Sequence, residues 1–192
     1  MDQAMTNEYR PGRINPQKFG LWISMGSLIM MFGAFTSAYI VRHAAGNWLE
    51  FAIPPIFVWR TVTLLVSSIC LQTSYYMFTK ENKSLYRGML ITAFLLGVTF
   101  LILQYQGWMQ LYAWGVDFKI NPSASFFYLI NIVHAAHVVA GLTTLIVALI
   151  HAFGLKFEVT EVRKDRFQLV LQFWHFLGFL WIYLYIFLLL TR

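Results

Sequence analysis

The chain has 192 residues, of which 59% are hydrophobic and 11% are charged, and its formal net charge at pH 7 is +6. Soluble domains carry about 25% charged residues, so this composition excludes an ordinary soluble domain and favours a protein that lies in lipid. The basic residues lie in short stretches between apolar runs, which fits membrane topology and argues against nucleic acid as a partner.

Five apolar runs reach the roughly 20 residues that a helix needs to cross a bilayer. We predict transmembrane helices at about 19–41, 56–78, 88–111, 125–152 and 168–190. The first run is too long to be the apolar part of a secretory signal, so we interpret residues 1–18 as a retained cytoplasmic tail. The connections are short, and we therefore predict an all-α integral membrane protein whose single membrane domain spans residues 1–192 as a five-helix bundle.

The Lys and Arg residues predict the orientation of the bundle. Ten of the 14 lie in the tail, the second connection and the fourth connection, namely Arg10, Arg13, Lys18, Lys80, Lys83, Arg87, Lys156, Arg163, Lys164 and Arg166. The other four are Arg42, Arg60, Lys119 and Arg192. Because cytoplasmic loops carry the excess of basic residues, we predict that the N-terminus is inside and the C-terminus outside.

The predicted spans contain no acidic residue, because all eight Asp and Glu residues fall in the tail or in a connection. Proton relays and pumps place carboxylates at membrane depth, so we do not expect this chain to move protons alone. The sequence also contains no Gly-x-Ser-x-Gly, His-Glu-x-x-His or phosphate-loop motif. We predict no catalytic, cofactor-binding or metal-binding residue in this chain.

Three of the four histidines in the predicted spans leave two interpretations open. His134 and His137 share a helix face, and His175 lies at about the same membrane depth as His137. A haem held between His137 and His175 is therefore allowed by spacing. The alternative is that the histidines hydrogen-bond neighbouring helices or a lipid headgroup.

Arg60 lies one turn inside the predicted outer end of the second span. It is interpreted either as an anchor that snorkels beside Trp59 or as a ligand for a lipid phosphate. The candidate lipid-binding or structural residues are Arg60, His134, His137, Trp174 and His175.

Two histidine motifs resemble a known family. The segment Phe127-Tyr128-x-x-Asn131-x-x-His134-x-x-His137-Val138-x-x-Gly141 is similar to a pattern of haem–copper oxidase subunit III, as is the segment Phe173-Trp174-His175-Phe176-x-x-x-x-Trp181. The resemblance covers nearly the whole chain and fits the short, five-helix bacterial form. It departs at three positions, where Leu28, Arg60 and Gly178 replace a carboxylate, an asparagine and an aspartate of the family pattern.

The resemblance implies an accessory subunit of a proton-pumping cytochrome c oxidase that reduces O₂ to water in aerobic respiration. It implies that haem and copper lie in partner subunits, and that this chain packs against catalytic subunit I and binds structural phospholipid. It also implies a multi-pass protein of the bacterial inner membrane, with the other oxidase subunits as partners and a respiratory supercomplex as a further candidate assembly.

Three alternatives stay open at this point. The donor of the complex is cytochrome c or, for a quinol oxidase subunit III, a quinol. A cytochrome b-type membrane anchor would hold one haem between His137 and His175. A small transporter would need helices broken by mid-span prolines, whereas all five prolines lie outside the predicted spans.

Overall fold

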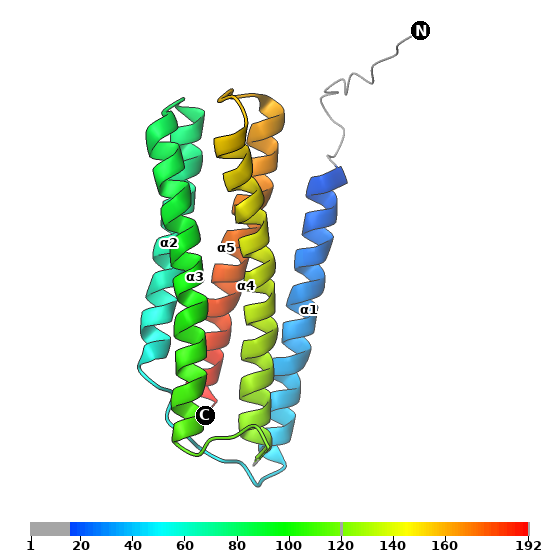
Figure 1. The fold of residues 1–192 in the computed structure, drawn as a ribbon. Helices are drawn as coiled ribbons and strands as arrows, with labels where there is room; N and C mark the ends of the chain where they lie inside the picture. The colour runs from blue at the N-terminus through cyan, green and yellow to red at the C-terminus, as the bar shows by residue number, and fades with distance from the viewer. Residues whose placement is uncertain (1–15, 120, 192) are drawn as a thin grey trace.

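A computed structural model of the chain describes residues 16–119 and 121–191. These residues form five α-helices and no strand (Figure 1). The helices are α1 Pro16–Ala44, α2 Ile56–Thr79, α3 Lys83–Ala113, α4 Pro122–Gly154 and α5 Glu161–Leu190. All five are long and apolar enough to cross a membrane. The prediction of an all-α bundle of five transmembrane helices is therefore confirmed, while residues 1–15 of the predicted tail lie outside the described residues.

Polar side chains start three of the helices. The side chains of Asn82, Asn121 and Thr160 accept hydrogen bonds from backbone N–H groups in the first turns of α3, α4 and α5. Such caps satisfy donors that a helix N-terminus leaves unpaired. The Thr160 cap makes α5 begin at Glu161 instead of near residue 168. Asp165, expected in a connection, therefore lies on α5.

Four helices form a closed ring and the fifth lies outside it. α2 packs on α3, α3 on α4, α4 on α5 and α5 on α2, whereas α1 contacts only α4 and α5 (Figure 1). In its most apolar stretch α1 is 11% buried, compared with 39% for α5. The core therefore lies inside the α2–α5 ring, and α1 is a peripheral helix with a large uncovered surface.

The helices alternate in direction, which groups the charged stretches. The start of α1, the α2–α3 connection and the α4–α5 connection lie together at one end of the bundle (Figure 1). We call this the basic end, because all the described Lys and Arg residues except Arg42, Arg60 and Lys119 lie in these stretches or in the first two turns of the helices that follow them. The charge asymmetry of the sequence is thus a real asymmetry of the folded bundle, and which end faces the cytoplasm stays a prediction.

Two glycines let the ring close tightly. A Cβ atom on Gly97 of α3 would lie 2.8 Å from side-chain atoms of both Leu142 and Trp174, and one on Gly107 would lie 2.7 Å from the Phe57 ring. Real Cβ atoms do not approach other atoms so closely, so large side chains of α2, α4 and α5 occupy the space that a side chain on α3 would need. Small residues serve this purpose widely in membrane bundles.

Candidate functional site

Arg60 lies at the centre of a polar cluster inside the ring. Its side chain is fully buried. One terminal nitrogen donates to Gln104 Oε1, and the other donates to Asn131 Oδ1 at 2.6 Å. The guanidinium carbon lies 3.9 Å from the Phe57 ring centroid and 3.8 Å from the Trp181 ring centroid. One side chain of α2 thus contacts α3, α4 and α5 at once.

The charge of Arg60 has no acidic partner in the described part of the chain. The ion pairs found there all lie at the basic end and join Lys18 to Asp165, Lys156 to Glu158 and Lys164 to Glu161. Two amide oxygens and two aromatic faces compensate the guanidinium instead, and aromatic faces attract cations most strongly when both are shielded from water. Burying a charge is costly unless it is compensated in this way.

The interpretation of Arg60 as a snorkelling anchor needs correction, whereas its role as a ligand for a lipid phosphate stays a prediction. A snorkelling anchor keeps its charged group at the membrane surface, but the side chain of Arg60 is 0% exposed and points into the ring. A lipid phosphate would have to displace the bonds to Gln104 and Asn131 to reach it. The geometry supports a structural role in which Arg60 joins the four helices of the ring.

His134 links α4 to α5 within the same cluster. Its side chain is fully buried, and its Nε2 lies 3.2 Å from the carbonyl oxygen of Leu177. A carbonyl only accepts, so this nitrogen carries the hydrogen and donates. The ring also lies against Trp181, at 5.1 Å between centroids, and Trp181 donates to Thr61 Oγ1 of α2 at 2.8 Å. His134 is therefore a helix-packing residue.

His137 and His175 face different neighbours. His137 bonds through Nδ1 to the carbonyl oxygen of Val133 on its own helix, and its ring lies 6.2 Å from that of Phe32 on α1. His175 Nε2 lies 3.0 Å from Gln72 Oε1 on α2. The two imidazoles thus make different contacts, His137 on its own helix beside α1 and His175 across to α2, which does not favour a shared haem. Nor do the described residues include any cluster of three His, Cys, Asp or Glu side chains suited to a metal ion.

The side chain of Trp174 lies in the core of the α2–α5 helix ring. It is 1% exposed, and atoms of its indole lie 2.8 Å and 3.0 Å from where Cβ atoms on Gly97 and Gly141 would be. It therefore packs α5 against α3 and α4 and offers no surface to a lipid.

A cavity of about 720 Å³ opens at the basic end between α1, α4 and α5. Much of its wall is apolar, with Leu21, Val147, Phe157, Val170 and Phe173 among the lining residues. Its cationic residues are Lys156, Arg163 and Arg166. Arg163 donates to the carbonyl oxygens of Lys156 and Glu158, which holds the connecting chain beside the cavity.

The five candidate residues predicted from sequence do not line this cavity. Sequence reasoning missed the cavity, because its walls come from helices far apart in the chain. One signal was present: the stretch after the fourth apolar run contains Lys156, Arg163, Lys164 and Arg166, and it was used only to predict orientation.

Comparison with known proteins adds independent information. A family model described as cytochrome c oxidase subunit III matches residues 17–191. "Probable quinol oxidase subunit 3" of Staphylococcus saprophyticus is 25% identical over 191 residues, covering 95% of this chain and 92% of the relative. "Cytochrome c oxidase subunit 3" of Corynebacterium diphtheriae is 27% identical over 182 residues, covering 91% of this chain and 87% of the relative. The protein of that name from Rattus norvegicus is 26% identical over 182 residues, covering 88% of this chain and 67% of the relative.

Proposed function

Because the chain belongs to the cytochrome c oxidase subunit III family, we propose that it is the accessory third subunit of a haem–copper oxidase in a bacterial respiratory membrane. The observation that carries this proposal is the family match over residues 17–191, which includes all five helices. The high coverage of the two bacterial relatives supports the short form of the subunit. The complex reduces O₂ to water, and in this proposal the chain stabilises the subunit that does so.

The polar groups inside the ring support an accessory role. Arg60, Gln104, Asn131 and His134 are buried and bonded to one another or to neighbouring helices, so none of them is exposed to a substrate. We place the haem and copper centres in the partner subunits, as the family assignment implies.

The relatives support two electron donors. One is named a quinol oxidase subunit and others are named cytochrome c oxidase subunits, at nearly equal identity to this chain. We propose cytochrome c as the donor of the complex and quinol as the second candidate. In either case the donor binds to another subunit.

Purification of the complex tests the subunit assignment. An affinity-tagged chain, extracted in mild detergent, should carry with it larger subunits that contain haem and copper. The same chain expressed without those subunits should give no pyridine haemochrome signal. A signal near one haem per isolated chain would contradict the proposal and favour the cytochrome b-type anchor.

We also propose that the cavity at the basic end holds a phospholipid with an anionic group. Its apolar wall suits acyl chains, and its cations suit a phosphate. Arg166 of α5 and Lys156 of the α4–α5 connection both line the cavity and are exposed. We prefer this cavity to Arg60 and the three histidines as the candidate lipid site.

Lipid analysis of the purified complex tests this site. The double variant Lys156→Gln with Arg166→Gln should retain about one phospholipid fewer per complex after detergent washing. Lys83→Gln is the matched control, since Lys83 is exposed at the same end but does not line the cavity. Equal lipid content in both variants would reject the lipid site and leave the subunit assignment intact.

A further inference from the structure

A stripe of polar residues follows one face of α5. Asp165, Gln168, Gln172 and His175 recur at intervals of three and four, so their side chains share a helix face. The residues that α5 buries in the ring, such as Leu177 and Leu184, lie on the other side. The stripe thus faces away from the core.

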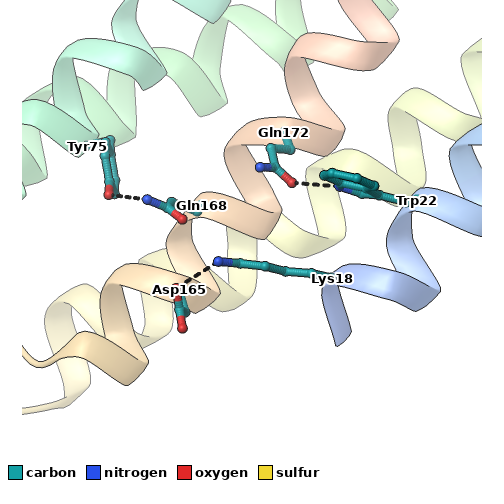
Figure 2. A network of polar contacts seen from close by, with 6 residues as sticks. All are labelled: Lys18, Trp22, Tyr75, Asp165, Gln168 and Gln172. Atoms are coloured by element: carbon teal, nitrogen blue, oxygen red, sulfur yellow. Dashed lines mark hydrogen bonds and ion pairs between the residues drawn. The ribbon is translucent and has the colours of Figure 1, made fainter. Parts of the chain in front are cut away.

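Each residue of the stripe bonds to α1 or α2, in alternation. Asp165 pairs with Lys18 of α1 at 3.0 Å, and Gln168 Nε2 donates to the Tyr75 hydroxyl of α2 at 2.7 Å (Figure 2). Further along α5, Gln172 Oε1 accepts from Trp22 Nε1 of α1 at 3.5 Å (Figure 2). His175 then bonds to Gln72 of α2. Because α1 and α2 do not contact each other, the stripe lies along an open face between them.

This open face reaches the middle of the membrane. His175 is halfway along α5, about 20 Å from the first residue of the helix at 1.5 Å per residue. Its bond to Gln72 is exposed on the surface of the chain. Polar groups at this depth are costly against lipid and normally face protein or a water-filled cavity.

A groove of about 400 Å³ lies beside the Gln72–His175 pair. It is lined by Leu65, Ser68, Ile69, Gln72, Thr73 and His175. Beyond it the same face of α5 becomes apolar, with Phe179 72% exposed and Ile186 50% exposed. The face therefore combines a central hydrogen-bonding point with an apolar surface, which is the pattern of a helix–helix contact in a membrane.

The hydrogen bonds of the pair define what it can bind. If His175 Nε2 donates to Gln72 Oε1, the Nδ1 of His175 is an acceptor and the amide nitrogen of Gln72 is a donor. The structure gives neither of these two atoms a partner within its described residues. An acyl chain can satisfy neither, whereas a hydroxyl or amide side chain can both donate and accept.

We propose that a transmembrane helix of another oxidase subunit docks on this open face between α1 and α2. It presents a hydroxyl or amide side chain to the Gln72–His175 pair, and its apolar residues cover Ile69 and Phe179. This inference rests on the proposed function, because it takes its partner from the same complex.

Photo-crosslinking in the intact complex tests the surface. A benzophenone amino acid replaces Ile69, which is 65% exposed in the groove, or Leu95 of α3, which is 56% exposed on the far side of the ring. Both complexes are purified, irradiated and analysed by mass spectrometry. We expect the Ile69 position to join a larger subunit and the Leu95 position to join none.

The other outcomes separate the two proposals. An Ile69 adduct with a second copy of this chain, or with lipid alone, would overturn the docking surface. So would an adduct with another subunit from Leu95 only. If no other oxidase subunit is present in the purified material, the proposed function fails as well.

A substitution tests the chemistry of the contact. The double variant Gln72→Leu with His175→Leu removes the hydrogen-bonding point from a surface position, so the chain itself should still fold. One interhelical hydrogen bond in a membrane corresponds to about a 3- to 20-fold change in an association constant, so retention of the chain in the complex should fall by about that factor. Thr99→Val, at an exposed position on α3, is the control and should retain the chain fully. Full retention of the double variant would overturn the hydrogen-bonding role.

Discussion

Arg60 shows how a bundle can hold a buried cation with amide oxygens and aromatic faces. One terminal nitrogen donates to the amide oxygen of Gln104 and the other to that of Asn131. The guanidinium also lies against the rings of Phe57 and Trp181. The arrangement needs a planar donor with several N–H groups, which lysine does not offer. The stability of the ring therefore depends on the whole cluster and not on the charge alone.

Truncation of Arg60 is the first prediction. Arg60→Ala should lower the free energy of unfolding by about 2–4 kcal/mol, because it leaves two buried acceptors unpaired and opens a cavity. The measurement is unfolding in mixed micelles with rising SDS, followed by tryptophan fluorescence.

A triple variant provides the control for this prediction. Arg60→Met, Gln104→Met and Asn131→Leu together replace all three polar partners by apolar side chains, so stability should return to within about 1 kcal/mol of the original. If the triple variant is no more stable than Arg60→Ala, the loss comes from packing and not from unpaired polar groups.

At the scale of the helices, the contact between α3 and α5 depends on Gly97. Atoms of the Trp174 indole of α5 and of Leu142 of α4 both lie 2.8 Å from where a Cβ atom on Gly97 would stand. The same indole also lies close to α4, where a Cβ atom on Gly141 would be 3.0 Å from it. The indole of Trp174 therefore has little space into which it could move.

The second prediction compares two glycines of the same helix. Gly97→Ala should destabilise the chain by about 1–3 kcal/mol, because it overpacks the α3–α5 contact. Gly88→Ala should be neutral or stabilise by up to about 1 kcal/mol, since no atom lies within 4 Å of its Cβ position and alanine favours a helix. SDS titration of both variants checks this, and equal effects at the two positions would contradict the packing argument.

The start of α5 shows why the predicted helix boundary lay too far along the chain, near residue 168 instead of Glu161. Glu161, Arg163, Lys164, Asp165 and Arg166 lower the hydropathy of its first turns, so an apolar run detects only the part beyond residue 168. Hydropathy measures which residues tolerate lipid, whereas the helix continues for as long as caps and local hydrogen bonds support it. The Thr160 cap was the signal that the apolar pattern did not use.

At the scale of the molecule, the charged connections predict the orientation in the membrane. The basic end should face the cytoplasm. In a Cys70→Ser background, Lys83→Cys should react with a membrane-impermeant maleimide only from the cytoplasmic side, and Lys119→Cys only from the outside. Labelling of both positions from the same side would contradict the five-span topology, and reversed labelling would contradict the orientation.

The last prediction concerns the assembled oxidase. A complex lacking this chain should still reduce O₂ at first, because we propose that the redox centres lie in other subunits. Its activity should then decline faster with turnover, because the surfaces and lipids that the chain covers become exposed. O₂ consumption over many turnovers measures this, with haem content determined before and after. An immediate and complete loss with haems intact would mean that the chain takes part in catalysis, and an identical decline would mean that it has no supporting role.

Sequence alone was sufficient for the five spans and the family. A bilayer demands about 20 apolar residues per helix, a property that each segment carries independently of its neighbours, and the histidine motifs identify the family through residue order. Which face of a helix meets which neighbour depends on packing between distant segments. The burial of Arg60, the different partners of His137 and His175, the cavity at the basic end and the open face between α1 and α2 all depend on that packing. They emerge only when the helices are assembled, because a polar side chain in lipid takes whichever partner the bundle brings within reach.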